Sequence, residues 1–167
     1  MTRRVLHRGR VGTFGLEDVV LPNGVAVTLE ILRHPGASAI LPVHGDGTVT
    51  LIRQHRHAAG GEIWEVPAGK LEPGEDPAAC AARELAEEAG LAGTLTPLIT
   101  ILTTPAFTDE RIYLYVATEL VAVPNGLDAD EILHPVRLPL SEAVTMVRRG
   151  DITDAKTICA ILTYAIP

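Results

Sequence analysis

The chain has 167 residues, of which 47% are hydrophobic and 21% charged, a balance typical of one globular domain and not of a disordered chain. Its net charge of −7 argues against a nucleic-acid partner held by a broad basic surface. No apolar run reaches the length of a membrane span, and two cysteines are too few for a disulfide framework. We therefore expect a soluble, cytoplasmic protein without a nucleic-acid or membrane partner.

Strands are expected in the first part of the chain and again around residue 110. Two β-rich runs near the N-terminus flank Pro22-Asn23-Gly24, and Asn-Gly between such runs is a strong hairpin signal. The other expected strands and extended pieces lie at 38–43, 49–56, 62–69, 98–104 and 111–120.

The helices are expected between and after these strands. The first begins after the capping residue Asp76 and stops at Gly90. A second is expected at 140–150, capped by Ser141, and the last at 154–165. This order of strands, helix, strands and helices predicts an α+β fold, or a mixed sheet sandwiched by helices.

The helix after Asp76 carries an unusual set of like charges. Glu84, Glu87 and Glu88 lie three and four residues apart, where like charges repel one another. We expect them on an exposed helix face beside a narrow apolar stripe. Carboxylates at this spacing offer oxygen ligands that suit Mg²⁺ or Mn²⁺ and not a soft metal. Arg83 lies four residues before Glu87 and can orient its carboxylate, and Glu75 in the preceding loop can approach the same point.

An isolated acidic cluster of this kind is usually a solvated surface, but here the whole segment follows one pattern. The pattern is G-x5-E-x7-R-E-U-x-E-E-x-G-U, with U apolar. Its specified positions are filled by Gly69, Glu75, Arg83, Glu84, Leu85, Glu87, Glu88, Gly90 and Leu91. The segment therefore resembles the Nudix box. The resemblance implies an α/β/α sandwich on a mixed sheet, in which water attacks a phosphorus of a substituted nucleoside diphosphate with the help of a divalent metal.

The same resemblance assigns roles within the box. It makes Glu84 and Glu88 the principal metal ligands, with the Ala68 carbonyl as a further candidate ligand. Glu87 and Glu75 are secondary. The implied cofactor is Mg²⁺, with Mn²⁺ as the alternative.

Stretches outside the box are similar to the ADP-ribose pyrophosphatase branch of the Nudix hydrolases, and this similarity covers most of the chain. They include 33–43, 51–70 and 103–117, and Pro105 stands where the branch has a proline. The usual Ser-Pro-Gly of that loop is Thr-Pro-Ala here, at 104–106. The resemblance implies cleavage of ADP-ribose to AMP and ribose 5-phosphate. The alternatives are hydrolysis of another nucleotide sugar such as GDP-mannose, and a binding module without turnover, although such a module is expected to lose box carboxylates and none is lost here.

Arg53 and Arg56 match arginines that hold the diphosphate in this branch, and a guanidinium fork suits phosphate oxygens. Alternate residues of a strand face opposite ways, so we favour Arg56 as the one that faces the site. A surface pair with Glu62 is an equal alternative for Arg53. Glu65 is a candidate for contact with the ribose or with water at the metal, the alternative being a carboxylate that stabilises the turn.

The loop at 105–110 supplies further candidates. By resemblance, Glu110 is the catalytic base, and Asp109 is the adjacent alternative because neighbouring side chains point opposite ways. Phe107 and Phe14 are weak candidates for the base pocket of the substrate, whereas Trp64 is assigned to the core.

The N-terminal strands resemble the dimerising arm of ADP-ribose pyrophosphatases. We expect residues 1–36 to form this strand region and 37–167 to form one compact Nudix hydrolase domain. The predicted assembly is a homodimer, in which the strands from about Val11 to Ile31 contribute to the substrate pocket of the partner.

Overall fold

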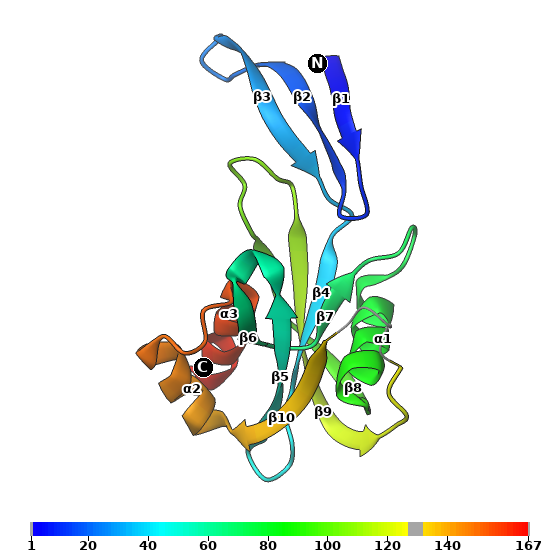
Figure 1. Cartoon of the computed structure of the whole chain (residues 1–167), viewed down its shortest axis with the longest axis vertical. Coiled ribbons are helices and arrows are strands. Elements are labelled where there is room, and N and C mark those ends of the chain that lie inside the picture. The colour runs from blue at the N-terminus through cyan, green and yellow to red at the C-terminus, as the bar shows by residue number, and fades with distance from the viewer. Residues whose placement is uncertain (1, 127–131, 167) are drawn as a thin grey trace.

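The computed structural model describes residues 2–126 and 132–166 (Figure 1). The strands are β1 Thr2–Arg8, β2 Thr13–Val20, β3 Ala26–Arg33, β4 Ala37–Pro42, β5 Thr48–Arg56, β6 Gly61–Glu65, β7 Ala68–Lys70, β8 Leu91–Leu102, β9 Arg111–Ala122 and β10 Leu133–Pro139. The helices are α1 Pro77–Ala89, α2 Leu140–Arg149 and α3 Ala155–Ala165, with a short 3₁₀ helix at His57–Ala59. None of the helices in the two described ranges is both long enough and apolar enough to cross a membrane.

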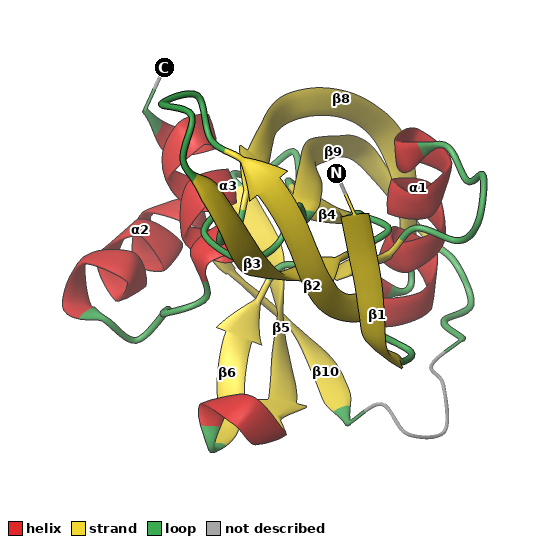
Figure 2. Ribbon diagram, turned by 90° about the horizontal axis from the view of Figure 1, so that it is seen from above, coloured by secondary structure: helices red, strands yellow, loops and turns green. Residues whose placement is uncertain are grey.

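The body of the molecule consists of two sheets, one of them mixed, with helices on two sides. One sheet has the strand order β7-β4-β9-β8 and the other β10-β5-β6, and β4 pairs with β9 in parallel while the other pairs of these sheets are antiparallel. Neighbouring residues of β4 face opposite ways: Ile40 packs in one cluster with Leu85 of α1, and Leu41 packs in another with Ile161 of α3. Figure 2 shows α1 on one side of the strands and α2 and α3 on the other. The predicted α+β sandwich is confirmed.

The N-terminal strands form an arm that stands apart from the body (Figure 1). The predicted turn between β2 and β3 is confirmed, with Gly24 at φ 83°, a conformation that favours glycine. The arm is nevertheless a three-stranded sheet and not a simple hairpin, because β1 pairs with β2 as well. All of β1 is exposed, so its sequence carries no buried face whose alternation could have predicted a strand.

The first helix follows its predicted signals and the second departs from them. Asp76 caps α1 by accepting hydrogen bonds from the N–H groups of Ala78 and Ala79, and Gly90 ends it in the left-handed conformation. The prediction that Ser141 caps α2 is wrong. Strand β10 runs directly into α2, which begins at Leu140 without a side-chain cap, so Ser141 already lies inside the first turn.

The whole of β10 and the first half of β8, both of which contain proline, were not predicted. Strand β10 ends at Pro139 and β8 includes Pro97, and proline is normally a signal against a strand interior because it cannot donate to the ladder. Both strands lie at the edge of their sheets, where one side of the backbone needs no partner. The sheet edge therefore tolerates prolines that hide these strands from a sequence-based prediction.

An ion pair fastens β2 to β3 near the body. Glu17 is only 2% exposed, and Arg33 binds it with both arms of its guanidinium, Nε donating to Oε1 at 2.8 Å and Nη2 donating to Oε2. These hydrogen bonds lower the pKa of Glu17 below its ordinary value of 4.5. The carboxylate is therefore stabilised in its charged form at neutral pH.

We expect Glu17→Gln to lower the free energy of unfolding by about 1–3 kcal/mol at neutral pH, because a charge-assisted pair is lost. A carboxylate whose folded pKa is lowered contributes fully above its unfolded pKa, and the contribution disappears as the pH falls through the folded pKa. The difference between wild type and variant should therefore shrink as the pH falls below about 4.5. Urea unfolding across this range measures it, with Glu30→Gln, an exposed glutamate of β3, as control. A difference that stays constant with pH would contradict the ion pair.

Candidate active site

A cleft of about 1110 Å³ lies where β5, β7, α1, the β8–β9 loop and the start of α3 meet. Its lining includes Arg56, Glu65, Arg83, Glu84, Glu88, Glu110 and Lys156. Acidic and basic groups from segments far apart in the sequence therefore converge on one space, which is the arrangement expected of a site for a charged ligand.

Glu84 and Glu88 are buried at this cleft, at 7% and 2% exposure. The prediction that they lie on an exposed helix face is therefore wrong, and only Glu87, whose side chain is 40% exposed, fits it. The cause is the strand β7, which lies against α1: the N–H of Ala68 donates to Oε2 of Glu88 at 2.7 Å. A Cβ atom on Gly69 would stand 1.7 Å from Oε1 of Glu84, so only glycine leaves room for this carboxylate.

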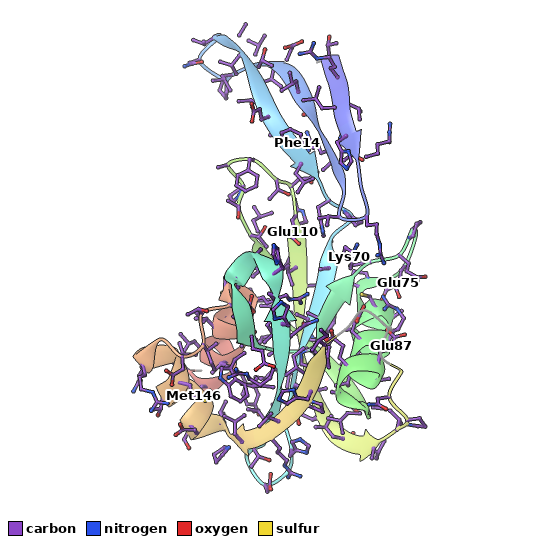
Figure 3. The ribbon with its side chains drawn as sticks, in the orientation of Figure 1. Phe14, Lys70, Glu75, Glu87, Glu110 and Met146 are labelled. Atoms are coloured by element: carbon purple, nitrogen blue, oxygen red, sulfur yellow. The ribbon has the colours of Figure 1, made fainter. Side chains whose placement is uncertain are left out.

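Arg83 offsets the repulsion among the carboxylates of the box. Its guanidinium donates to Glu75 at 3.0 Å, to Glu84 at 2.6 Å and, as predicted, to Glu87 at 3.1 Å. The hydrogen bond from Arg83 is the largest cause that lowers the pKa of Glu75 to about 2. Glu75 therefore binds Arg83, and in Figure 3 it lies on the α1 side of the molecule together with Glu87. Neither of them lines the cleft.

The donors at the cleft fit a hard divalent cation. Within 2–126 and 132–166, no three His, Cys, Asp or Glu side chains are already gathered around one point. Glu84 and Glu88 nevertheless lie one helical turn apart, both face the cleft, and both offer carboxylate oxygens, which suit Mg²⁺ or Mn²⁺. The space that a Cβ of residue 69 would fill is kept open beside Glu84. The hydrogen bond seen for Ala68 involves its N–H, and metal binding by its carbonyl stays a prediction.

We expect Gly69→Ala to displace the Glu84 carboxylate, because the added methyl group overlaps it. The substitution should lower the free energy of unfolding by about 1–3 kcal/mol, the usual cost of overpacking. It should also reduce the rise in Tm that Mg²⁺ gives the wild type. Thermal unfolding with and without Mg²⁺ measures both effects. Gly45→Ala is the matched control, since its Cβ would meet no atom within 4 Å. A Gly69→Ala protein with the wild-type Tm and Mg²⁺ response would contradict this account.

A second charged group lies on the other side of the cleft. Arg56 donates two hydrogen bonds to Glu65, at 2.7 and 2.8 Å, and Lys156 donates to the same carboxylate at 2.6 Å. Burial alone would raise the pKa of Glu65, but the hydrogen bonds and charges of Arg56 and Lys156 outweigh it and lower the pKa. Glu65 therefore holds the positively charged side chains of Arg56 and Lys156 at the cleft. Lys156 was not predicted, since it lies 91 residues from Glu65 and has no motif around it.

Arg53 is placed differently from Arg56. It does not line the cleft, its Nη2 donates to Glu62 at 3.0 Å, and its guanidinium lies 4.8 Å from the ring centre of Trp64. This is the surface pair that the sequence left open as the alternative. Trp64 packs against the core, as predicted.

The loop between β8 and β9 sends Glu110 to the cleft. Oε2 of Glu110 accepts a hydrogen bond from Oγ1 of Thr103 at 2.8 Å, and Oε1 lies 3.5 Å from Nδ1 of His34. Phe107 is 50% exposed and, like Phe14 of the arm, does not line the cleft. Figure 3 shows Glu110 at the end of the body that faces the arm, with Phe14 on the arm itself.

A sandwich with the acidic helix α1 beside a cleft of this kind defines a class of hydrolase, and residues 32–161 match the model of the NUDIX domain. The chain therefore belongs to the Nudix family, and it is a Nudix diphosphatase. Nudix diphosphatases of this kind depend on a divalent metal.

Similar proteins cover nearly the whole chain. It is 42% identical over 159 residues to the methanol dehydrogenase activator of Bacillus methanolicus, a match that covers 93% of this chain and 86% of that protein. It is 39% identical over 164 residues to the ADP-ribose pyrophosphatase of Bacillus subtilis (strain 168), covering 96% of this chain and 89% of that one. The crystal structure of an ADP compounds hydrolase superposes with a TM-score of 0.80 at 26% identity, covering 99% of this chain and 93% of that one.

Proposed function

We propose that this enzyme hydrolyses ADP-ribose to AMP and ribose 5-phosphate, with Mg²⁺ as its metal. The observation that carries the proposal is the meeting, in one cleft, of two buried carboxylates of α1, two positively charged side chains and a separate carboxylate. These are Glu84 and Glu88, Arg56 and Lys156, and Glu110. The similarity to the ADP-ribose pyrophosphatase of Bacillus subtilis supports the choice of substrate.

The cations at the cleft suit the diphosphate of such a substrate. The chain as a whole carries a net charge of −7, so an anionic substrate needs positive charge supplied locally. Arg56 presents a planar fork that matches phosphate oxygens, and Glu65 holds that fork in place. Lys156 adds a second positive charge beside it. Glu65 lines the cleft, whereas Arg53 and Phe107 do not. Contacts of all three residues with the substrate stay predictions.

The proton of the attacking water goes to Glu110 in this proposal. Water attacks a phosphorus of the diphosphate, the bridging P–O bond breaks, and the two halves leave as AMP and ribose 5-phosphate. Glu84 and Glu88 would hold the cation, which when bound would neutralise charge on the diphosphate and lower the pKa of water. Carboxylates engaged with a metal are poor bases, whereas Glu110 reaches the cleft from a separate loop.

A substrate panel tests the proposal. ADP-ribose, GDP-mannose, UDP-glucose, NADH and dinucleoside polyphosphates are each incubated with enzyme and Mg²⁺, and products are resolved by chromatography. We expect the highest kcat/KM for ADP-ribose. A higher kcat/KM for GDP-mannose would transfer the same mechanism to that nucleotide sugar and contradict the substrate assignment.

We also propose that residues 1–36 form a dimerising arm and that residues 37–167 form the hydrolase domain. The arm exposes large apolar side chains that a monomer would leave in water, namely Val5, Leu6, Val11, Val20, Val25 and Leu29. The turn between β1 and β2 also reaches the cleft, where Arg10 and Val11 contribute to the lining. In the dimer, the strands from about Val11 to Ile31 contribute to the pocket of the partner. A monomeric mass in light scattering, at a concentration where the enzyme is fully active, would contradict this assembly.

A further inference from the structure

The end of β3 lies directly beside the loop that carries Glu110. The N–H of Leu32 donates to the carbonyl of Phe107 at 2.8 Å, and Leu32 forms an isolated parallel bridge with Thr108. The next two residues of the chain both bind Asp109: Nη1 of Arg33 donates to Oδ2 at 2.9 Å, and the N–H of His34 donates to Oδ1 at 2.9 Å. Both oxygens of Asp109 are therefore engaged by the strand that leads from the arm into the body.

Arg33 connects this loop to the interior of the arm. The same guanidinium that binds Asp109 binds Glu17, whose side chain is only 3% exposed, in a two-pronged pair. One planar cation thus bridges a carboxylate of β2 and a carboxylate of the loop, a geometry that the single ammonium of lysine cannot reproduce. The position of the loop is therefore fixed to the base of the arm.

Asp109 is poorly suited to be the catalytic base. Burial would raise the pKa of Asp109, but the hydrogen bonds from the His34 N–H and from Arg33 outweigh it, so the pKa is lowered. A general base works best with a pKa near the working pH, and the lowered pKa of Asp109 lies further from it. It also does not line the cleft.

Glu110 faces the other way. Its N–H donates to Oγ1 of Thr108 at 3.2 Å, and its side chain accepts from Oγ1 of Thr103 and lines the cleft. Asp109 and Glu110 are neighbours in the chain, so tying Asp109 to Arg33 fixes the backbone from which Glu110 projects. A shift of about 1 Å in a reacting group can cost roughly 10²-fold in rate.

We propose that Asp109 is a positioning residue, which binds Arg33 above Glu17 and so ties the loop to the arm and presents Glu110 to the cleft. The proposal rests on the proposed role of Glu110 as the base. It also assigns the arm a role in turnover within its own chain, because β2 and β3 carry the partners of the loop.

The test compares Asp109→Asn and Arg33→Lys with a matched control. Asparagine keeps the shape of Asp109 but replaces one acceptor oxygen by an NH2 group, which cannot accept a hydrogen bond from Arg33 or His34. Lysine keeps the charge of Arg33 but loses the planar fork of the guanidinium. Asp18→Asn removes a carboxylate from the same strand as Glu17, where it accepts a hydrogen bond from Thr28 at the exposed surface. We expect Asp109→Asn to lower kcat by about 10- to 100-fold while KM changes by less than about threefold. Amide exchange at Leu32 and in the loop should quicken in Asp109→Asn and Arg33→Lys and stay unchanged in Asp18→Asn.

The decisive measurement repeats Asp109→Asn in the Glu110→Gln protein. If Asp109 acts through Glu110, its replacement lowers kcat no further in that background, because residues that act as a unit are not additive. An equal loss in both backgrounds would overturn the proposal. Unchanged kcat and exchange in Asp109→Asn would also overturn it, while leaving the base assignment intact as long as Glu110→Gln is impaired. Wild-type kcat in Glu110→Gln would overturn both, and the substrate panel would still decide the hydrolase activity.

Discussion

Glu84→Gln and Glu88→Gln should each lower kcat by about 10³-fold or more while the protein stays folded. A metal supplies several kcal/mol of charge stabilisation in the transition state, and each 1.36 kcal/mol is a factor of about ten in rate. The amide keeps the size of the side chain but loses the charge that holds a hard cation. Since both carboxylates are buried, the substitutions also cost stability. For Glu84→Gln, which loses the negative charge of its ion pair with Arg83, we expect about 1–3 kcal/mol.

Three measurements separate a lost ligand from a damaged fold. They are kcat at saturating Mg²⁺, Mn²⁺ binding by titration calorimetry, and the Tm. Glu142→Gln, at an exposed glutamate of α2, controls for the loss of one negative charge far from the cleft. The kcat of Glu87→Gln should lie between that of the Glu84 and Glu88 variants and that of the Glu142→Gln control, because Glu87 contacts Arg83 but does not line the cleft. Full activity with undiminished Mn²⁺ binding in Glu84→Gln or Glu88→Gln would refute the metal-ligand assignment.

Glu110→Gln should lower kcat by about 10²–10⁴-fold with little change in KM, because a general base acts in the transition state and not in ground-state binding. Glutamine can still accept the hydrogen bond from Thr103, so the loop should keep its position. The measurements are steady-state kinetics and amide exchange of the loop, with Thr103→Val as a comparison that removes the hydrogen bond but keeps the base. If Glu110→Gln retains the wild-type kcat with an unchanged loop, the base lies elsewhere, with a box glutamate as the next candidate.

Features of the fold that depend on neighbours in sequence could be predicted from the sequence. The cap of α1 at Asp76 and its stop at Gly90 depend on a few adjacent residues, and so does the turn at Gly24. The prolines of β8 and β10 point against strands unless the strand is known to lie at a sheet edge, which only the assembled sheet decides.

In the candidate site, too, features set by local sequence could be predicted, and features set by the tertiary fold could not. The spacing of the Nudix box placed Glu84, Glu87 and Glu88 on neighbouring positions of α1, because that is fixed by the helical repeat, but only Glu84 and Glu88 line the cleft. It did not predict that Glu84 and Glu88 are buried, since their burial depends on β7 lying against the helix. Gly69 was the available signal, as a fixed glycine of the box beside a carboxylate. No local signal could place Lys156 beside Glu65, since this contact joins segments that only the tertiary fold brings together.

The central claim is a metal-dependent cleavage of ADP-ribose at its diphosphate. The most direct test measures AMP and ribose 5-phosphate formed from ADP-ribose, first with Mg²⁺, then after chelation, then after Mg²⁺ is restored. We predict equimolar AMP and ribose 5-phosphate with Mg²⁺, loss of both products on chelation, and recovery when the metal returns. Absence of cleavage with Mg²⁺, or an equal rate in the presence of the chelator, would contradict the account.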